Sequence, residues 1–153
     1  MSNILKPSPN FKQQAAAYVE APLGAHLSGQ LTTAKYYGVL GAPRFAGRIA
    51  NAVLSVGACG RDDTNTLSLE ADILINGTTC LTTKPKITRV QAVASTNRTT
   101  NSSGQGVVKA VMASTNSYNA GDIITYACTL TRTATPTTEM ANAALVVELR
   151  PND

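Results

Sequence analysis

Hydrophobic and polar residues alternate over short stretches of this 153-residue chain, and turn residues separate those stretches. The clearest case is residues 67–75, where leucine, alanine and isoleucine occupy every second position and mostly polar residues lie between them. Side chains of a β-strand point alternately to opposite faces, so this pattern predicts a strand with one buried face. The Asn76–Gly77 pair follows directly and predicts a tight hairpin, because a type I′ turn needs positive φ angles at both central residues.

The same signals recur along the rest of the chain. They predict further strands over residues 35–40, 45–56, 78–83, 87–94, 107–113, 123–132 and 143–149. About eight strands with regularly spaced turns, and no convincing internal helix, predict an all-β fold that is a single antiparallel β-sandwich. A jelly roll of about eight strands is the topology we expect for a domain of this size.

Residues 1–30 differ from the rest of the chain and predict an extended N-terminal arm. Pro7 and Pro9 prevent regular structure at the start, because proline lacks an N–H group and restricts the residue before it. Residues 11–20 have the composition for one or two helical turns. The arm holds few large apolar residues, so it orders either against a partner or along its own domain. We therefore expect an arm over residues 1–30 and a β-sandwich (jelly-roll) domain over residues 31–153.

Positive charge is concentrated in the N-terminal third of the chain. The whole chain carries 13 Lys and Arg against 9 Asp and Glu, a net charge of +4, and all of this excess falls within residues 1–48. Two interpretations stay open: a basic region that docks on an acidic partner surface, or a chance scatter of solvated side chains. The basic residues are sparse and no aromatic stacking platform accompanies them, so we expect no nucleic acid partner.

The sequence shows no signal for a membrane or for secretion. No apolar run approaches the roughly 18 residues that a membrane-spanning helix needs, and the first 20 residues lack an apolar signal core. The cysteines Cys59, Cys80 and Cys128 are odd in number and not closely paired. This favours buried thiols in a chain made in a reducing cytosol over a disulfide framework or a zinc site, although one disulfide between two of them stays open.

The sequence offers little that an enzyme needs. His26 is the only histidine, and its glycine-rich surroundings predict a surface or contact residue rather than a catalyst. Asp62 and Asp63 in a turn, with Glu70 and Asp72 on the next strand, contain oxygen ligands for calcium, but their spacing favours solvated turn carboxylates. A chain with no Trp and two Phe has little from which to build a sugar-stacking cleft. We therefore expect no catalytic residue, no metal and no cofactor.

Four stretches carry a resemblance to a known family, and it covers about half of the chain. These stretches are Ile73–Thr78, Thr83–Ile87, Asn119–Ile124 and Asn142–Leu149. In them the sequence resembles the small jelly-roll decoration (cement) or fibre-type subunits of tailed-bacteriophage capsids and tails, whereas residues 1–48 show no such likeness. The resemblance implies a virion protein that is made in the bacterial host cytoplasm and lies on the capsid surface.

The resemblance also implies partners. Cement proteins of this kind usually form trimers at capsid symmetry axes and cover the junctions between capsomers, so we expect a homotrimer that binds the major capsid protein. The residues expected to contact the capsid from the arm are Lys6, Phe11, Lys12, Tyr18 and His26. The edge around Tyr36 and Tyr37 is the expected self-association surface.

An alternative function is a tail- or fibre-associated module that recognises a host surface glycan. A loop such as Ser95–Gly106 would carry the binding site, and Tyr118 beside a turn is the best candidate for an aromatic platform. An enzyme is the third and least favoured class.

Overall fold

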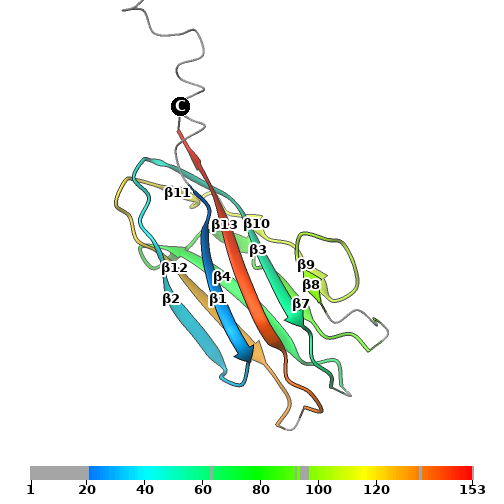
Figure 1. Cartoon of the computed structure of the whole chain (residues 1–153). Coiled ribbons are helices and arrows are strands. Elements are labelled where there is room, and N and C mark those ends of the chain that lie inside the picture. Colours follow the sequence, from blue (N-terminus) through cyan, green and yellow to red (C-terminus); the bar gives the residue numbers. More distant parts are fainter. Residues whose placement is uncertain (1–20, 63, 92, 94–96, 135, 153) are drawn as a thin grey trace, which may run out of the picture.

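The computed structural model describes residues 21–62, 64–91, 93, 97–134 and 136–152, and these residues form strands and turns but no helix. Most strands belong to two antiparallel sheets that pack face to face (Figure 1). The five-stranded sheet contains, in spatial order, β1 (Leu23–Gln30), β13 (Ala141–Pro151), β3 (Gly47–Ala58) and β11 (Ser117–Tyr118), with β8 (Arg98–Thr99) also paired to β3. The six-stranded sheet contains β2 (Lys35–Gly41), β12 (Ile124–Thr131), β4 (Ser68–Ile75), β7 (Lys86–Thr88) and β9 (Val107–Val108), with β5 (Thr78–Thr79) also paired to β4. A two-stranded sheet joins β6 (Leu81–Thr83) to β10 (Val111–Met112).

The predicted all-β sandwich is therefore confirmed, and β4 shows why its sequence was informative. Its inward-facing residues are buried: Leu69, Ala71, Ile73 and Ile75. The hairpin that follows is also confirmed, because Asn76 and Gly77 have φ angles of 48° and 84° and Ile75 pairs with Thr78 across the turn. The positive φ at both positions is the conformation that the Asn-Gly pair adopts with the least strain.

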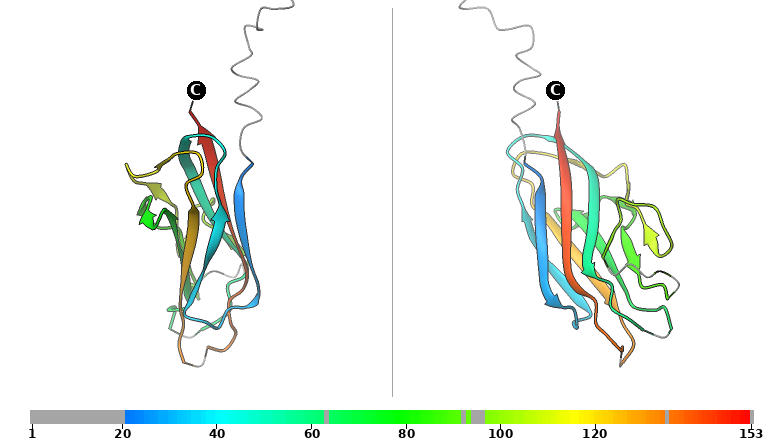
Figure 2. Two further views of the ribbon diagram at one scale, coloured as in Figure 1. Left: turned by 90° about the vertical axis from the view of Figure 1, so that its left-hand side faces the viewer. Right: turned by 45° about the vertical axis from the view of Figure 1, so that its right-hand side comes forward.

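One set of strand pairings is nested along the chain. β1 pairs with β13, β2 with β12, β3 with β11, and β4 with β7. Consecutive strands from β1 to β4 alternate between the two sheets, so the chain passes from one layer to the other at each connection (Figure 2). As a result β1 and β2 are outer strands of different sheets and lie beside one another at one margin of the sandwich (Figure 2).

The core fills the space between the two sheets. Its largest fully buried side chains include Leu31, Ile49, Leu54, Leu67, Leu69, Ile73, Ile87, Ile124, Met140 and Val147. Burial of one such side chain stabilises the fold by about 1.5–3 kcal/mol relative to its exposure to water. The alternation that builds this core also determines which side chains of the same strands face outward.

The boundary predicted for the N-terminal arm needs correction, because Leu23–Gln30 forms β1. The strand pairs with β13 from Leu23 opposite Val147 to Gln30 opposite Ala141. Leu23 and Leu27 pack against the core, while Gly24 and His26 between them are exposed. The alternation was present in the sequence, but the glycines among these residues obscured it. The predicted helical turns at residues 11–20 lie outside the described residues.

Two predicted strands are shorter in the structure than the sequence indicated. Among the described residues of the strand predicted over 87–94, only those of β7 form a strand, and the strand predicted over residues 107–113 is divided between β9 and β10. Thr88 donates a hydrogen bond to the carbonyl oxygen of Gly106 at 2.7 Å and Arg89 donates to that of Leu67 at 2.7 Å. The backbone there leaves the regular ladder, because it is bonded to loop residues rather than along one partner strand.

Candidate functional site

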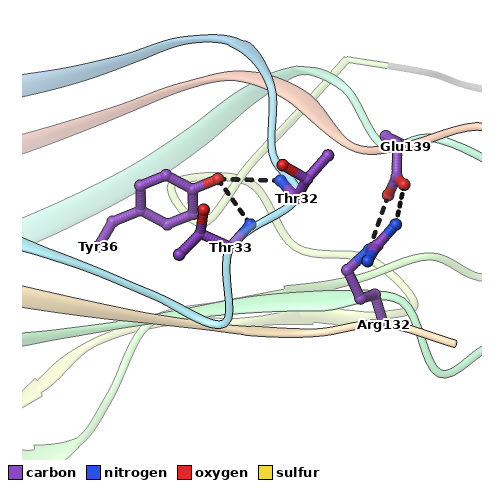
Figure 3. A network of polar contacts seen from close by, with 5 residues as sticks. All are labelled: Thr32, Thr33, Tyr36, Arg132 and Glu139. Carbon is purple, nitrogen blue, oxygen red and sulfur yellow. Dashed lines mark hydrogen bonds and ion pairs between the residues drawn. The ribbon is translucent and has the colours of Figure 1, made fainter. Parts of the chain in front are cut away.

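The turn from β1 into β2 is held by the hydroxyl group of Tyr36. The backbone N–H groups of Thr32 and Thr33 donate hydrogen bonds to its oxygen at 2.9 and 3.1 Å (Figure 3). The half-buried ring packs against the core. Burial alone would raise the pKa of Tyr36, but the donated hydrogen bonds stabilise the phenolate and the pKa is lowered overall. Tyr36 therefore orients the beginning of β2.

An ion pair stands close to this turn. The guanidinium group of Arg132, just after β12, donates two hydrogen bonds to the carboxylate of Glu139, one of them from Nε to Oε2 at 3.0 Å (Figure 3). The hydrogen bonds that Arg132 donates to the Glu139 carboxylate raise the pKa of Arg132. Nearby, the N–H of Leu31 donates to the carbonyl oxygen of Met140 at 2.7 Å. These contacts tie the start of β2 to the end of β12 and the start of β13.

Strand alternation points Tyr37 away from the core. Tyr37 is 76% exposed and Val39 is 68% exposed, the highest values among the large hydrophobic side chains of the described residues. The sequence places Tyr36 and Tyr37 at one expected edge, but the structure separates them, because the Tyr36 hydroxyl group bonds to Thr32 and Thr33 of the same chain. The sequence-based prediction also missed Val39, although a spacing of two residues places it on the same face as Tyr37.

Tyr37 and Val39 belong to rows of side chains that cross three strands. The first row is Val39, Thr125 and Leu74; the second is Tyr37, Ala127 and Asp72; the third is Lys35, Thr129 and Glu70. Directly opposed residues on neighbouring strands have Cβ atoms about 5 Å apart, so each row is a continuous surface. We call these nine residues the Tyr37 face. The Ala and Thr side chains in the middle strand are short, so Tyr37 and Val39 stand above them.

Charge on the Tyr37 face is confined and partly neutralised. Lys84 forms an ion pair with one carboxylate oxygen of Asp72 at 3.5 Å, and the hydroxyl group of Thr79 donates to the other at 2.5 Å. Lys35 and Glu70 occupy the third row, away from Val39. The face therefore has an uncharged end and a charged end, which is how the centre and the rim of a protein interface differ.

Of the predicted capsid-contact residues, His26 lies within the described part of the chain. It is exposed on the outer side of β1, opposite Ala144 of β13 in the register. The other four, Lys6, Phe11, Lys12 and Tyr18, lie outside the described residues. His26 belongs to the five-stranded sheet and Tyr37 to the six-stranded sheet, so the two predicted contact surfaces face in opposite directions.

A second candidate site is a surface pocket beside β3, at the loop that contains β8. Its volume is about 610 Å³. Residues that line it include Ser55, Val56, Val93, Arg98, Ser103 and Gln105. We call it the loop pocket. The loop Ser95–Gly106 was the sequence-based candidate for glycan binding, and the described part of that loop forms most of the pocket wall. Tyr118, the expected aromatic platform, is 2% exposed and so offers no platform to a ligand.

Hydrogen bonds of Thr99 and Thr100 hold the loop that lines the pocket against β3. The N–H of Leu54 donates to the hydroxyl oxygen of Thr100 at 2.9 Å, and the N–H of Thr100 donates to the carbonyl oxygen of Leu54 at 2.8 Å. The hydroxyl group of Ser55 donates to that of Thr99 at 3.0 Å. Thr100 is 2% exposed, so water competes little for these bonds. The loop is thus held at a defined distance from the strand.

Asp62 is buried, which corrects the expectation of a solvated turn carboxylate. It is 2% exposed, and its Oδ2 accepts hydrogen bonds from the N–H groups of Thr66 and Leu67, both at 2.8 Å. The hydroxyl groups of Thr64 and Thr66 donate to the same oxygen. Burial alone would raise the pKa of Asp62, but these hydrogen bonds outweigh it and the pKa is lowered. The carboxylate organises the turn between β3 and β4.

The structure places no metal centre among the residues it describes. Within them, no group of three or more His, Cys, Asp and Glu side chains has an arrangement that would hold a metal ion. Asp63, one of the four carboxylates weighed for calcium, lies outside the described residues.

The three cysteines confirm the interpretation as buried thiols. Cys59, Cys80 and Cys128 are buried and unpaired with one another. Burial raises the pKa of Cys128 to about 12, and burial together with the nearby charge of Asp72 raises the pKa of Cys80 to about 12. Such thiols are not nucleophiles at neutral pH.

No protein-family model matches the chain, and neither a curated protein nor a solved structure shows significant similarity to it. In the described part of the chain there is also no helix that could span a membrane. The Tyr37 face and the loop pocket are the two candidate functional surfaces.

Proposed function

We propose that this protein is a structural virion subunit that decorates the outer surface of a phage capsid, binds the major capsid protein and stabilises the junctions between capsomers. The exposure of Tyr37 and Val39 together on the Tyr37 face carries the proposal. Water around two large apolar side chains on a surface of short ones is released when a partner covers them, which favours association. The partner proposed for this face is a second copy of the chain.

A homotrimer is the proposed assembly, with the Tyr37 face of each copy against its neighbour. Tyrosine is enriched and charge is depleted at the centre of protein interfaces, as at the Val39 end of this face. Lys35 and Glu70 then lie at the rim, where they set the relative orientation of the copies. β2 is the outer strand of its sheet, so its free backbone groups are available to the neighbouring copy as well.

The proposed topology is a jelly roll. Its support is the nested pairing of β1 with β13, β2 with β12, β3 with β11 and β4 with β7, since a jelly roll is an antiparallel ribbon rolled into two sheets. Jelly rolls of this kind occur in viral capsid domains.

The proposed contact with the capsid involves residues 1–22 and the outer side of β1. Residues 1–30 carry Lys6 and Lys12 against Glu20, an excess of one positive charge, and the two lysines are proposed to meet acidic patches on the shell. A trimer presents three such segments at once, so weak contacts of each add up to firm attachment. His26 and its neighbours on β1 lie next to the point where that segment enters the sheet.

The location is tested by quantitative mass spectrometry of purified virions of the phage that encodes the chain. A decoration subunit is expected at a copy number comparable with that of the major capsid protein. A soluble cytoplasmic protein of the host serves as the control for carry-over. Absence of the chain from virions, or a few copies per particle associated with tails, would contradict the proposal, and the second result would favour the alternative of a tail- or fibre-associated glycan-binding module.

The assembly is tested by size-exclusion chromatography with light scattering. The full chain is expected at three times its own mass, and the double variant Tyr37→Ser/Val39→Thr is expected as a monomer. Loss of two central apolar side chains weakens association by about 100-fold or more. Val146→Thr is the matched control, since Val146 is 45% exposed on β13 of the other sheet and this variant should stay trimeric. A wild-type monomer, or a trimer that survives the double substitution, would contradict this interface.

A further inference from the structure

The loop pocket has the charge of an anion-binding site. Among the described residues that line it, Arg98 is the one charged side chain, and none is Asp or Glu. A second guanidinium group stands behind the wall, because Nη1 of Arg89 donates to the carbonyl oxygen of Val93 at 2.8 Å and Val93 lines the pocket. Two cations with no carboxylate between them favour a ligand that carries negative charge.

The position of Arg98 is fixed by the loop itself. Nη2 of Arg98 donates a hydrogen bond to the backbone carbonyl oxygen of Gln105, across the loop. The guanidinium group has five N–H donors in a planar fork, so this bond orients the group and leaves further donors for a bidentate contact with a carboxylate. The ring of residues from Arg98 to Gln105 is thereby closed around the pocket.

The rest of the lining suits a polyhydroxylated molecule. Hydroxyl groups of Ser55, Ser102 and Ser103 and the side-chain amide of Gln105 line the pocket, and each of these groups can both donate and accept. Val93 adds an apolar wall against which the C–H face of a sugar ring can pack. The volume of about 610 Å³ exceeds that of a single sugar residue and lies within the range of small-ligand sites.

We infer that the loop pocket binds an acidic saccharide, with the carboxylate of the sugar on Arg98 and its hydroxyl groups on the serine and glutamine side chains. The inference goes beyond the proposed capsid role and does not depend on it, because the pocket lining contains no residue of β1 or of the Tyr37 face. On a virion surface such a site would hold the particle to an acidic polysaccharide coat.

The test is an NMR titration of the full chain, in which glucuronate and glucose are compared as probes. Glucuronate is expected to shift the backbone amide signals of residues 98–105 with a dissociation constant in the millimolar range or tighter, and glucose is expected to bind at least about tenfold more weakly. The two probes differ only in the carboxylate, so the comparison isolates the contact to Arg98. Equal affinity for the two sugars, or no shift with glucuronate at about 20 mM, would overturn the inference.

Two variants locate the binding in the pocket. Arg98→Gln is expected to weaken glucuronate binding about tenfold or more, and Arg150→Gln, which changes an exposed arginine paired with Glu148 on β13, is expected to leave it unchanged. Ser103→Ala keeps the bond between Arg98 and Gln105 and therefore the loop, yet it is expected to weaken glucuronate by a fewfold through the lost hydroxyl group. Equal losses in Arg98→Gln and Arg150→Gln would mean a general charge effect and would reject the site. Unchanged binding in Arg98→Gln and Ser103→Ala would reject it as well.

Discussion

The Tyr37 face and the loop pocket are built by different means from the same sandwich. The Tyr37 face consists of three regularly paired strands, and alternation along β2, β12 and β4 is enough to align its rows. The loop pocket forms where the chain leaves the long ladders, and its loop is fixed to β3 by the short pairing of β8 together with side chains, above all that of Thr100. A flat exposed face therefore needs only the register of a sheet, whereas a concave site needs further anchors. Substitutions can separate the two.

The largest effect is expected from loss of the Asp62 carboxylate, which stabilises the turn between the two sheets that carry these surfaces. Asp62→Ala leaves the buried N–H groups of Thr66 and Leu67 without their acceptor, in the turn that connects the two sheets. The free energy of unfolding should fall by about 2–4 kcal/mol, measured by urea denaturation. Glu148→Ala, at an exposed position on β13, is the control and should change it by less than about 0.5 kcal/mol. If Asp62→Ala unfolds at the same urea concentration as the wild type, the carboxylate does not stabilise the fold.

At low pH the stabilisation that the ionised Asp62 carboxylate provides should be lost. The pKa of Asp62 is lower in the folded state than its ordinary value, so its contribution to stability is complete above about pH 4 and is lost as the pH falls through the folded-state pKa. Asp62→Asn cannot titrate at this position. The gap in unfolding free energy between the wild type and Asp62→Asn should therefore narrow below about pH 4, measured by urea denaturation at stepwise lower pH. A gap that is constant with pH would contradict the role assigned to the charged carboxylate.

A smaller loss of stability is expected from a substitution that affects the loop pocket and not the Tyr37 face. Thr100→Val removes the hydroxyl acceptor of the Leu54 N–H and is expected to cost about 1–2 kcal/mol. Hydrogen exchange should accelerate at the amides of Leu54 and Thr100, and glucuronate binding should weaken with it. Self-association through the Tyr37 face should stay at the wild-type level. Thr131→Val, at an exposed position on β12, is the matched control and should leave stability and glucuronate binding unchanged. Loss of self-association in Thr100→Val would contradict the independence of the two surfaces.

The smallest effect should act on the face alone. Tyr36→Phe keeps the ring in the core but removes the oxygen that accepts from Thr32 and Thr33. These bonds are partly exposed to water, so the loss is expected at about 0.5–1 kcal/mol. The start of β2 becomes less ordered, and analytical ultracentrifugation should show association weakened by a fewfold. Glucuronate binding in this variant should equal that of the wild type; a change there would mean that the two surfaces are coupled.

The sequence predicted the elements whose side chains alternate cleanly, and it failed where glycine or loop residues interrupt the alternation. β4 and the Asn76–Gly77 hairpin were recognisable because local chemistry alone specifies them. β1 was missed because Gly24 and Gly29 weaken the pattern and because an outer strand buries only one side of a short stretch. Its place in the sheet depends on β13, which lies far away in the sequence.

The same distinction, between local sequence pattern and contact with distant residues, applies to the site residues. Tyr37 could be proposed because a large aromatic side chain in a strand pattern is conspicuous, but the sequence did not show that Tyr36 faces inward, since that depends on the register with β12. Asp62 was judged a solvated residue because aspartate in a polar turn is common. Its burial follows from how residues 64–67 fold back over it, and no spacing in the sequence records that contact.

The pairing of β1 with β13 also bears on how the protein is made. Leu23 lies opposite Val147 in the register, so the first described strand has no partner until almost the whole described chain has left the ribosome. Sandwiches dominated by such distant pairings fold in milliseconds to seconds, much more slowly than helical domains. During that interval β3, with its core-facing side of apolar residues, is without the strand that covers its edge. Until β13 has been synthesised, the nascent chain therefore leaves one edge of β3 and the apolar side of β1 open to aggregation.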